Sequence, residues 1–161
     1  MRKKELRFTV DVYSSIEELS TADACLLTAA RAATQHAYAP YSRFLVGAAA
    51  SLQNGKIVTG TNQENASYPV GLCAERVLLS AVASQEQGVA INTIAVSYNN
   101  LQGESNRPVS PCGICRQSLA EFEDRFGHPI RIILSGMTGE VHIVETVKHL
   151  LPLSFGSADM K

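Results

Sequence analysis

Apolar residues recur along this chain with two periods, and each period predicts a type of secondary structure. Within residues 6–13, Leu6, Phe8, Val10 and Val12 alternate with polar residues. This is the period of a strand with one buried face. We expect the stretch to lie at the edge of a sheet.

Helical spacing appears in longer segments of the chain. The first helix can begin at Ser20 or Thr21, whose hydroxyl groups suit an N-cap, and should stop near Pro40 because proline disfavours helical geometry before it. Apolar residues at helical spacing predict helices over about residues 21–37, 73–85, 113–126 and 145–151.

Strand-like segments lie between these helices. Residues 44–52 and 56–62 flank Asn54 and Gly55, a dipeptide that suits a tight hairpin turn, so they should pair antiparallel. Further strands are expected at residues 91–98, 130–134 and 141–144. Helices alternating with strands predict an α/β domain with a mixed sheet and helices on its faces. We expect residues 1–161 to form one domain, with 1–14 as an N-terminal extension or edge strand.

Composition and charge narrow the classes of function. The 161 residues are 45% hydrophobic and carry a net charge of -1, which indicates a folded domain without the basic surface that binds nucleic acid. No segment approaches the roughly 20 apolar residues of a membrane span, and no signal peptide is evident. We therefore expect a cytoplasmic protein with no nucleic acid or membrane partner.

Three cysteines and one carboxylate form the decisive pattern. Cys73 and Glu75 stand at the start of one predicted helix, and Cys112 and Cys115 stand at the start of another. Cys112 and Cys115 are three residues apart, so both can face one side of their helix. We expect the three thiolates to bind one zinc ion, near the positive ends of two helix dipoles.

Three protein ligands leave the fourth position of a tetrahedral zinc ion for water, which is typical of a catalytic site. Glu75, two residues after a ligand, can act as general acid and base, and Arg76 can add a compensating positive charge. The pattern resembles the signature of zinc deaminases in its three-cysteine form. Glu75 would then carry protons from water to the pyrimidine ring nitrogen and to departing ammonia.

Two other interpretations of the cysteines are open. Cys112 and Cys115 could belong to a closed structural zinc site or to a redox pair, but neither explains Cys73 with Glu75. Cys25 lies within a helical apolar run and is expected to be a small buried residue. The four histidines show no paired metal spacing: His36, His128, His142 and His149.

Over residues 38–160 the chain resembles the small cytidine deaminase family. Four motifs carry the resemblance in the family's order: 41–48 (YSRFLVGA), 62–69 (NQENASYP), 73–76 (CAER) and 111–117 (PCGICRQ). The resemblance implies a three-layer α/β fold with a mixed five-stranded sheet and helices on both faces. It also implies hydrolytic deamination of cytidine and deoxycytidine, with one zinc per subunit.

The family resemblance also implies roles for individual residues. Asn62 and Glu64 would hydrogen-bond a ribose hydroxyl, and Phe44 would pack against the nucleoside. Backbone around Ala74 would hold the base, and Tyr68 would join the substrate-binding residues. Without the family, Asn62 and Glu64 could instead end a strand and satisfy local backbone groups.

The C-terminal residues 151–156 (LPLSFG) resemble the family's tail. The resemblance implies a homotetramer in which Phe155 reaches a neighbouring subunit's site; alternatively, Phe155 only packs the last helix on the core. Two features depart from the family pattern: the segment before Ser14, and Gln63, which stands where an aliphatic residue is expected. In an extended segment Gln63 should point away from its neighbours in the motif.

Two other functions fit parts of the pattern. A related cytosine nucleoside such as blasticidin S could be the substrate, since its deaminases have similar motifs. A catalytically silent zinc-binding or interaction protein would also use the cysteines, but it gives Glu75 no purpose. Deaminases of polynucleotides usually have histidine as the first ligand, where this chain has Cys73.

Overall fold

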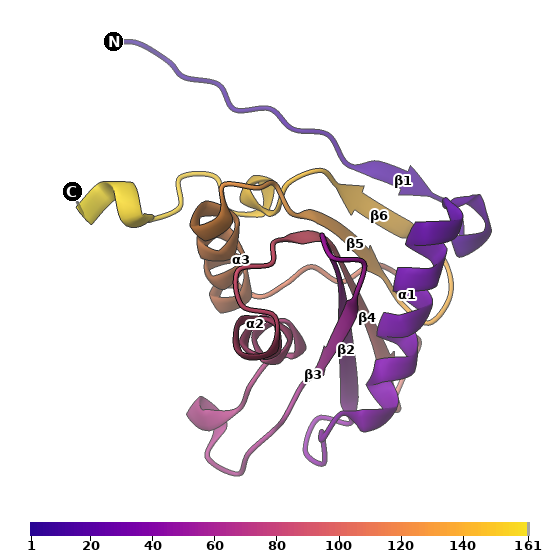
Figure 1. Cartoon of the computed structure of the whole chain (residues 1–161). Coiled ribbons are helices and arrows are strands. Elements are labelled where there is room, and N and C mark those ends of the chain that lie inside the picture. Colours follow the sequence, from indigo (N-terminus) through magenta and orange to yellow (C-terminus); the bar gives the residue numbers. More distant parts are fainter. Residues whose placement is uncertain (161) are drawn as a thin grey trace.

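The computed structural model describes residues 1–160, which form a mixed β-sheet covered by α-helices on both faces (Figure 1). Short 3-10 turns connect several of these elements. In chain order the helices and strands are β1 (Asp11–Tyr13), α1 (Thr21–Ala33), β2 (Phe44–Leu52), β3 (Ile57–Thr61), α2 (Ala74–Gln85), β4 (Ile91–Asn100), α3 (Gly113–Phe126), β5 (Arg131–Ser135) and β6 (Val141–Val144).

Within the described residues the sheet has six strands in the order β1-β6-β5-β4-β2-β3. Only β4 and β5 are parallel, and the other neighbours are antiparallel. The predicted five-stranded sheet is therefore wrong by one strand. The sixth strand is β1, which pairs with the outer edge of β6 and so satisfies backbone groups that would otherwise stay open at the sheet edge.

The N-terminal strand is shorter than its hydrophobic pattern predicted. Residues 6–13 alternate as a strand should, yet only Asp11–Tyr13 pair with β6. Strand β6 has only four residues, so the chain before Asp11 has little partner strand to pair with. Its apolar side chains, including Leu6 and Phe8, stay largely exposed.

Two apolar layers hold the fold together because successive side chains of a strand point to opposite faces. Ala49, Ala95 and Ile133 face α1, whereas their neighbours in the same strands face α2 and α3. Figure 1 shows α1 on one side of the sheet and α2 with α3 on the other. This arrangement confirms the α/β layers and the mixed sheet expected from the sequence.

The main helices lie close to where the sequence placed them. Ser20 caps α1 by accepting a hydrogen bond from the N–H of Asp23 at 3.2 Å. The α-helix ends at Ala33, earlier than expected, and continues as a 3-10 turn, Thr34–His36. The expected helix at residues 145–151 is a 3-10 turn, Val147–Leu150. No helix within residues 1–160 is long and apolar enough to cross a membrane.

Glycines let the helices approach the sheet closely. A Cβ atom at Gly60 in β3 would lie 2.4 Å from the backbone nitrogen of Leu78 and 2.7 Å from the carbonyl oxygen of Ala74, both in α2. On the other face, a Cβ atom at Gly47 would lie 2.2 Å from the carbonyl oxygen of Ala30 in α1. Only glycine leaves room for the backbone of α2 at this distance from β3.

Gly60→Ala should therefore destabilise the protein. The added methyl group meets backbone atoms of α2, which cannot rotate away, so overpacking should cost about 2 to 3 kcal/mol. Urea unfolding of the two proteins measures the difference. Gly113→Ala is the matched control, because nothing lies within 4 Å of a Cβ atom there. Equal midpoints for Gly60→Ala and the unaltered protein would contradict this explanation.

Candidate metal centre and active site

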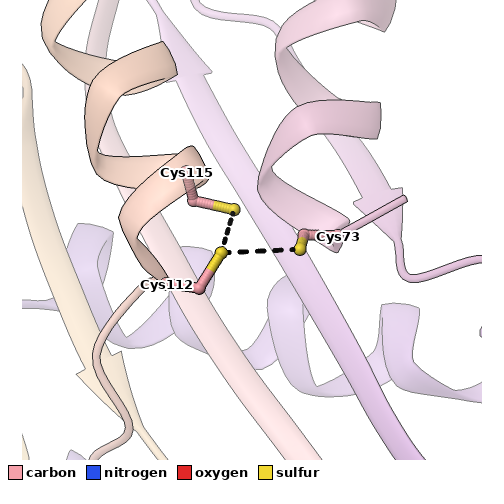
Figure 2. A group of neighbouring side chains, drawn as sticks. All are labelled: Cys73, Cys112 and Cys115. Carbon is pink, nitrogen blue, oxygen red and sulfur yellow. Dashed lines mark hydrogen bonds between the residues drawn. The ribbon is translucent and has the colours of Figure 1, made fainter. Parts of the chain in front are cut away.

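Helices α2 and α3 begin side by side, and their first turns bring three cysteines together (Figure 2). Cys73 is the N-cap residue of α2, Cys112 is the N-cap residue of α3, and Cys115 lies in the first turn of α3. The Sγ atoms of Cys73 and Cys112 are 3.7 Å apart, and those of Cys112 and Cys115 are 3.5 Å apart. All three ligand atoms lie within 4.8 Å of one another.

These sulfur atoms fit a tetrahedral zinc ion. Zinc–sulfur bonds of about 2.3 Å at tetrahedral angles separate two sulfurs by about 3.8 Å. The two Sγ–Sγ separations in the structure, 3.7 and 3.5 Å, are close to that value. Within residues 1–160 no other group of three such side chains comes together, so the set offers three protein ligands and no fourth.

The surroundings of the cysteines favour a thiolate. Interaction with the Cys115 thiol lowers the pKa of Cys73 to about 6, and the charge of Arg76 acts in the same direction. The same interaction raises the pKa of Cys115, since the proton stays on that sulfur. The N-termini of two helices also favour negative charge at this point. A divalent cation would stabilise all three thiolates.

Glu75 lies directly beside the cysteines in the first turn of α2 and is almost fully buried, with 5% of its surface exposed. Burial raises the pKa of its carboxyl group above the usual range. A carboxyl group with a raised pKa holds a proton more readily than an exposed one, which suits a group that takes up and delivers protons. Glu75 lines the same cavity as Cys73 and Cys112.

That cavity has a volume of about 370 Å³, which lies within the range of small-molecule sites. It is bounded by β2, β4, the starts of α2 and α3 and the loop after β3. The lining residues are Phe44, Val46, Asn62, Gln63, Glu64, Tyr68, Gly71, Leu72, Cys73, Ala74, Glu75, Val96, Ser97, Tyr98, Val109, Ser110, Cys112 and Ser135. The structure thus brings together on one cavity Phe44 from the first motif, Asn62, Glu64 and Tyr68 from the second, Cys73, Ala74 and Glu75 from the third, and Cys112 from the fourth.

Asn62 and Glu64 brace the backbone around the cavity. The Asn62 side chain accepts a hydrogen bond from the N–H of Val46 at 2.7 Å and donates to the carbonyl of Phe44 at 2.9 Å. The Glu64 carboxylate accepts from the N–H of Tyr41 at 2.9 Å. Both residues therefore make the local backbone contacts that one interpretation expected, and both also line the cavity.

The aromatic residues of the motifs differ in their surroundings. Phe44 stacks on Tyr98 with ring centroids 4.7 Å apart, which gives the cavity a flat apolar wall. Tyr68 is 76% exposed at the cavity rim and meets Tyr41 edge-on. Gln63 also lines the cavity, although its side-chain amide donates to the hydroxyl of Thr61 at 2.9 Å.

Three predicted site residues are absent from the cavity lining: Cys115, Arg76 and Phe155. Cys115 is fully buried in the first turn of α3. The charge of Arg76 helps to lower the pKa of Cys73, and Phe155 is 60% exposed in the C-terminal segment. Cys25 joins no cysteine group, but the expectation that it is buried was wrong: it is exposed, because it lies on the outer side of α1 beside the buried Leu26.

Several cavity residues were not singled out from the sequence. Val109 and Ser110 come from the loop before α3, and Ser97 and Ser135 come from β4 and β5. Ser97 is buried, and its hydroxyl donates to the carbonyl of Gly136 at 3.1 Å. The polar Ser97 within the apolar run of β4 could have indicated a cavity residue from the sequence alone. Nothing in the sequence around Val109 and Ser110 indicates that they line the cavity.

Comparison with known proteins agrees with this geometry. The family described as "Cytidine and deoxycytidylate deaminase zinc-binding region" matches residues 20–126. A cytidine deaminase from Halalkalibacterium halodurans is 39% identical over 137 residues, which cover 84% of this chain and 95% of that protein. This chain belongs to the cytidine deaminase family.

Solved cytidine deaminases have the same fold. The cytidine deaminase from Burkholderia pseudomallei superposes with a TM-score of 0.71 and 38% identity, covering 85% of this chain and 100% of that chain. The cytidine deaminase from Mycobacterium tuberculosis gives a TM-score of 0.65 at 33% identity, covering 85% of this chain and 99% of that chain. A blasticidin-S deaminase from Bacillus cereus is 30% identical over 112 residues, 68% of this chain and 76% of that protein.

Cys112→Ala should abolish tight zinc binding, since two thiolates cannot hold the ion as three do. We expect about one zinc ion per chain in the unaltered protein and far less in the variant, measured by elemental analysis. A chelator should lower the thermal midpoint of the unaltered protein and leave that of the variant unchanged.

Cys25→Ala is the matched control, because Cys25 lies outside the cysteine group. It should keep its zinc and its response to chelator. Full zinc content in Cys112→Ala would show that this cysteine is not a ligand.

Proposed function

We propose that this cytidine deaminase family member hydrolyses cytidine and deoxycytidine to uridine and deoxyuridine with release of ammonia. One observation carries the proposal: three cysteine sulfurs lie within 4.8 Å of one another, and two of these cysteines, Cys73 and Cys112, line a cavity of about 370 Å³ together with the buried Glu75. The family match supplies the class of reaction.

Cys73, Cys112 and Cys115 would hold the zinc ion. When bound there, zinc supplies a Lewis acid with one open coordination position, at which the pKa of water falls toward neutrality. The charge of Arg76, which already lowers the pKa of Cys73, would offset the excess negative charge of three thiolates. The protein's remaining task is to move protons and to hold the base.

Glu75 is the proton carrier in this proposal. Because burial raises its pKa, the carboxyl group can take a proton from water and deliver it to the ring nitrogen N3 of cytosine. The same group would then protonate the 4-amino nitrogen as ammonia departs. The second proton would come from the hydroxyl group that water has added to C4. One carboxyl group can serve both transfers, since N3 and the exocyclic amino nitrogen are both bonded to C4.

The other cavity residues would hold the nucleoside. Phe44, fixed by stacking on Tyr98, would pack against it, and the backbone at Ala74 would hold the base. Asn62 and Glu64 would bind a ribose hydroxyl with the hydrogen-bonding capacity that bracing the backbone leaves free. Tyr68 would close the cavity rim.

The assembly we propose is a homotetramer whose sites are completed across subunit interfaces. Phe155 supports this proposal, because its ring is 60% exposed and absent from the cavity lining of its own chain. An exposed aromatic side chain at the end of an ordered segment is suited to a neighbouring subunit's cavity. The single domain, the absence of nucleic acid and membrane partners and the cytoplasmic location expected from the sequence stay predictions.

Blasticidin S is a second candidate substrate, favoured by the relative from Bacillus cereus. The two candidate functions differ in the group attached to the cytosine ring that the cavity must accept. Comparing kcat/KM for cytidine, deoxycytidine and blasticidin S separates them. We expect the two simple nucleosides to be preferred. A protein that binds zinc but turns over none of the three would contradict the proposed function.

Glu75→Gln should retain the fold and the zinc ion but lose most activity. The amide cannot carry a proton, so kcat for cytidine should fall about a hundredfold to ten-thousandfold. The decrease in absorbance as cytidine becomes uridine measures it, and elemental analysis checks the metal.

Glu121→Gln makes the same chemical change on the exposed side of α3 and serves as the control. Its kcat should match that of the unaltered protein. Near-normal turnover by Glu75→Gln would remove Glu75 from its proposed role.

Phe155→Ala should weaken substrate binding without removing the chemistry. A ring that packs on bound nucleoside contributes equally to ground and transition states, so KM should rise about tenfold with kcat little changed. Light scattering during size-exclusion chromatography should report four chains per particle for the unaltered protein. A monomeric unaltered protein, together with a Phe155→Ala variant whose KM is unaltered, would contradict the assembly proposal.

A further inference from the structure

The segment that carries Phe155 contains a strained turn. Leu153 has a φ angle of +66°, a left-handed conformation that costs a leucine about 1 kcal/mol or more. Its side chain is 88% exposed, so no packing of that side chain holds the conformation in place. Such a turn persists only where the surrounding structure fixes it.

Two consecutive residues of α3 hold this turn at both ends. The Nη1 atom of Arg116 donates to the carbonyl of Leu150 at 3.0 Å, before the turn. The Nε2 atom of Gln117 donates to the carbonyl of Phe155 at 2.8 Å, after it. The segment between Leu150 and Phe155 is thus attached to one rigid helix by two side chains.

The same two residues directly follow the metal-binding cysteines. Arg116 also donates from Nε to the carbonyl of Pro111 at 2.8 Å, the residue before Cys112. The guanidinium group therefore joins the loop that positions a zinc ligand to the start of the C-terminal segment. Any shift of the first turn of α3 would be passed to the backbone that carries Phe155.

We propose that Gln117 and Arg116 are positioning residues that fix Phe155 for the neighbouring subunit's nucleoside site. This inference rests on the proposed function and adds to it, since it links the metal-binding turn of one subunit to substrate binding in the next. Gln117 holds the Phe155 carbonyl, so its contribution should pass through the Phe155 ring. Arg116 supports both the turn and the Pro111 loop, so its replacement should also disturb zinc binding.

A double-mutant cycle on Gln117 and Phe155 tests the proposal. Gln117→Met keeps the length of the side chain but removes the donor, and it should raise KM for cytidine about fivefold with kcat unchanged. Adding Gln117→Met to Phe155→Ala should raise KM no further, because the ring through which Gln117 acts is already gone. Independent contributions, in which the two increases multiply, would overturn the proposal.

Gln85→Met is the matched control, since Gln85 is an exposed glutamine at the end of α2. It should leave KM and kcat unchanged. A general loss of folding in Gln117→Met would lower kcat or the thermal midpoint, so an increase in KM at constant midpoint distinguishes positioning from instability. Unaltered KM in Gln117→Met, in an enzyme that otherwise deaminates cytidine, overturns this inference and leaves the proposed function standing.

Mixed assemblies show whether the effect crosses the interface. Gln117→Met subunits keep a working Glu75, whereas Glu75→Gln subunits keep Gln117 and Phe155. The two variants are unfolded together and reassembled into mixed particles. In these particles, the active sites of Gln117→Met subunits should receive a correctly held Phe155 from neighbouring Glu75→Gln subunits. KM should then fall toward that of the unaltered enzyme. A KM that stays at the Gln117→Met value would overturn action across the interface.

Discussion

The whole site depends on one constraint: two helix N-termini must meet at the edge of the cavity. Cys73 caps α2, Cys112 caps α3, and the two sulfurs approach to 3.7 Å only because both helices pack on the same face of the sheet. Gly60 allows α2 to approach closely enough. The helix dipoles then favour the negative charge that three thiolates gather. Zinc chemistry, the buried Glu75 and the cavity all follow from this packing.

Polar residues around the cavity serve the backbone as well as the proposed substrate. The Asn62 side chain hydrogen-bonds the backbone of both Phe44 and Val46 in β2. It thus satisfies the backbone groups of β2 at the point where regular strand pairing ends. Such a residue is already held in one conformation before substrate arrives, which reduces the entropy that binding must overcome. The fixed ring of Phe44 against Tyr98 has the same effect. Support of the backbone and binding of the nucleoside are therefore compatible roles for the same side chains.

Most of the fold and the metal centre could be predicted from the sequence, because they depend on local patterns. Helical spacing predicted α3, and the two cysteine motifs predicted the cluster now seen within 4.8 Å. The alternation of residues 6–13 predicted an edge strand, but the five strands implied by the family resemblance did not include it. Its short length could not be predicted, because pairing with β6 depends on the length of that partner strand. The exposure of Cys25 depends on which side of α1 faces the sheet, and Val109 reaches the cavity only through the path of a loop.

In the proposed metal centre, three sulfur donors hold zinc with one position left for a ligand that is not an amino acid. X-ray absorption at the zinc edge of the zinc-loaded protein tests it most directly, since the distances report the number and type of donors. We expect three sulfurs at about 2.3 Å and one lighter atom at about 2.0 Å, which is replaced when a hydrated pyrimidine nucleoside analogue binds. Four sulfur donors, or a shell that such an analogue leaves unchanged, would contradict it.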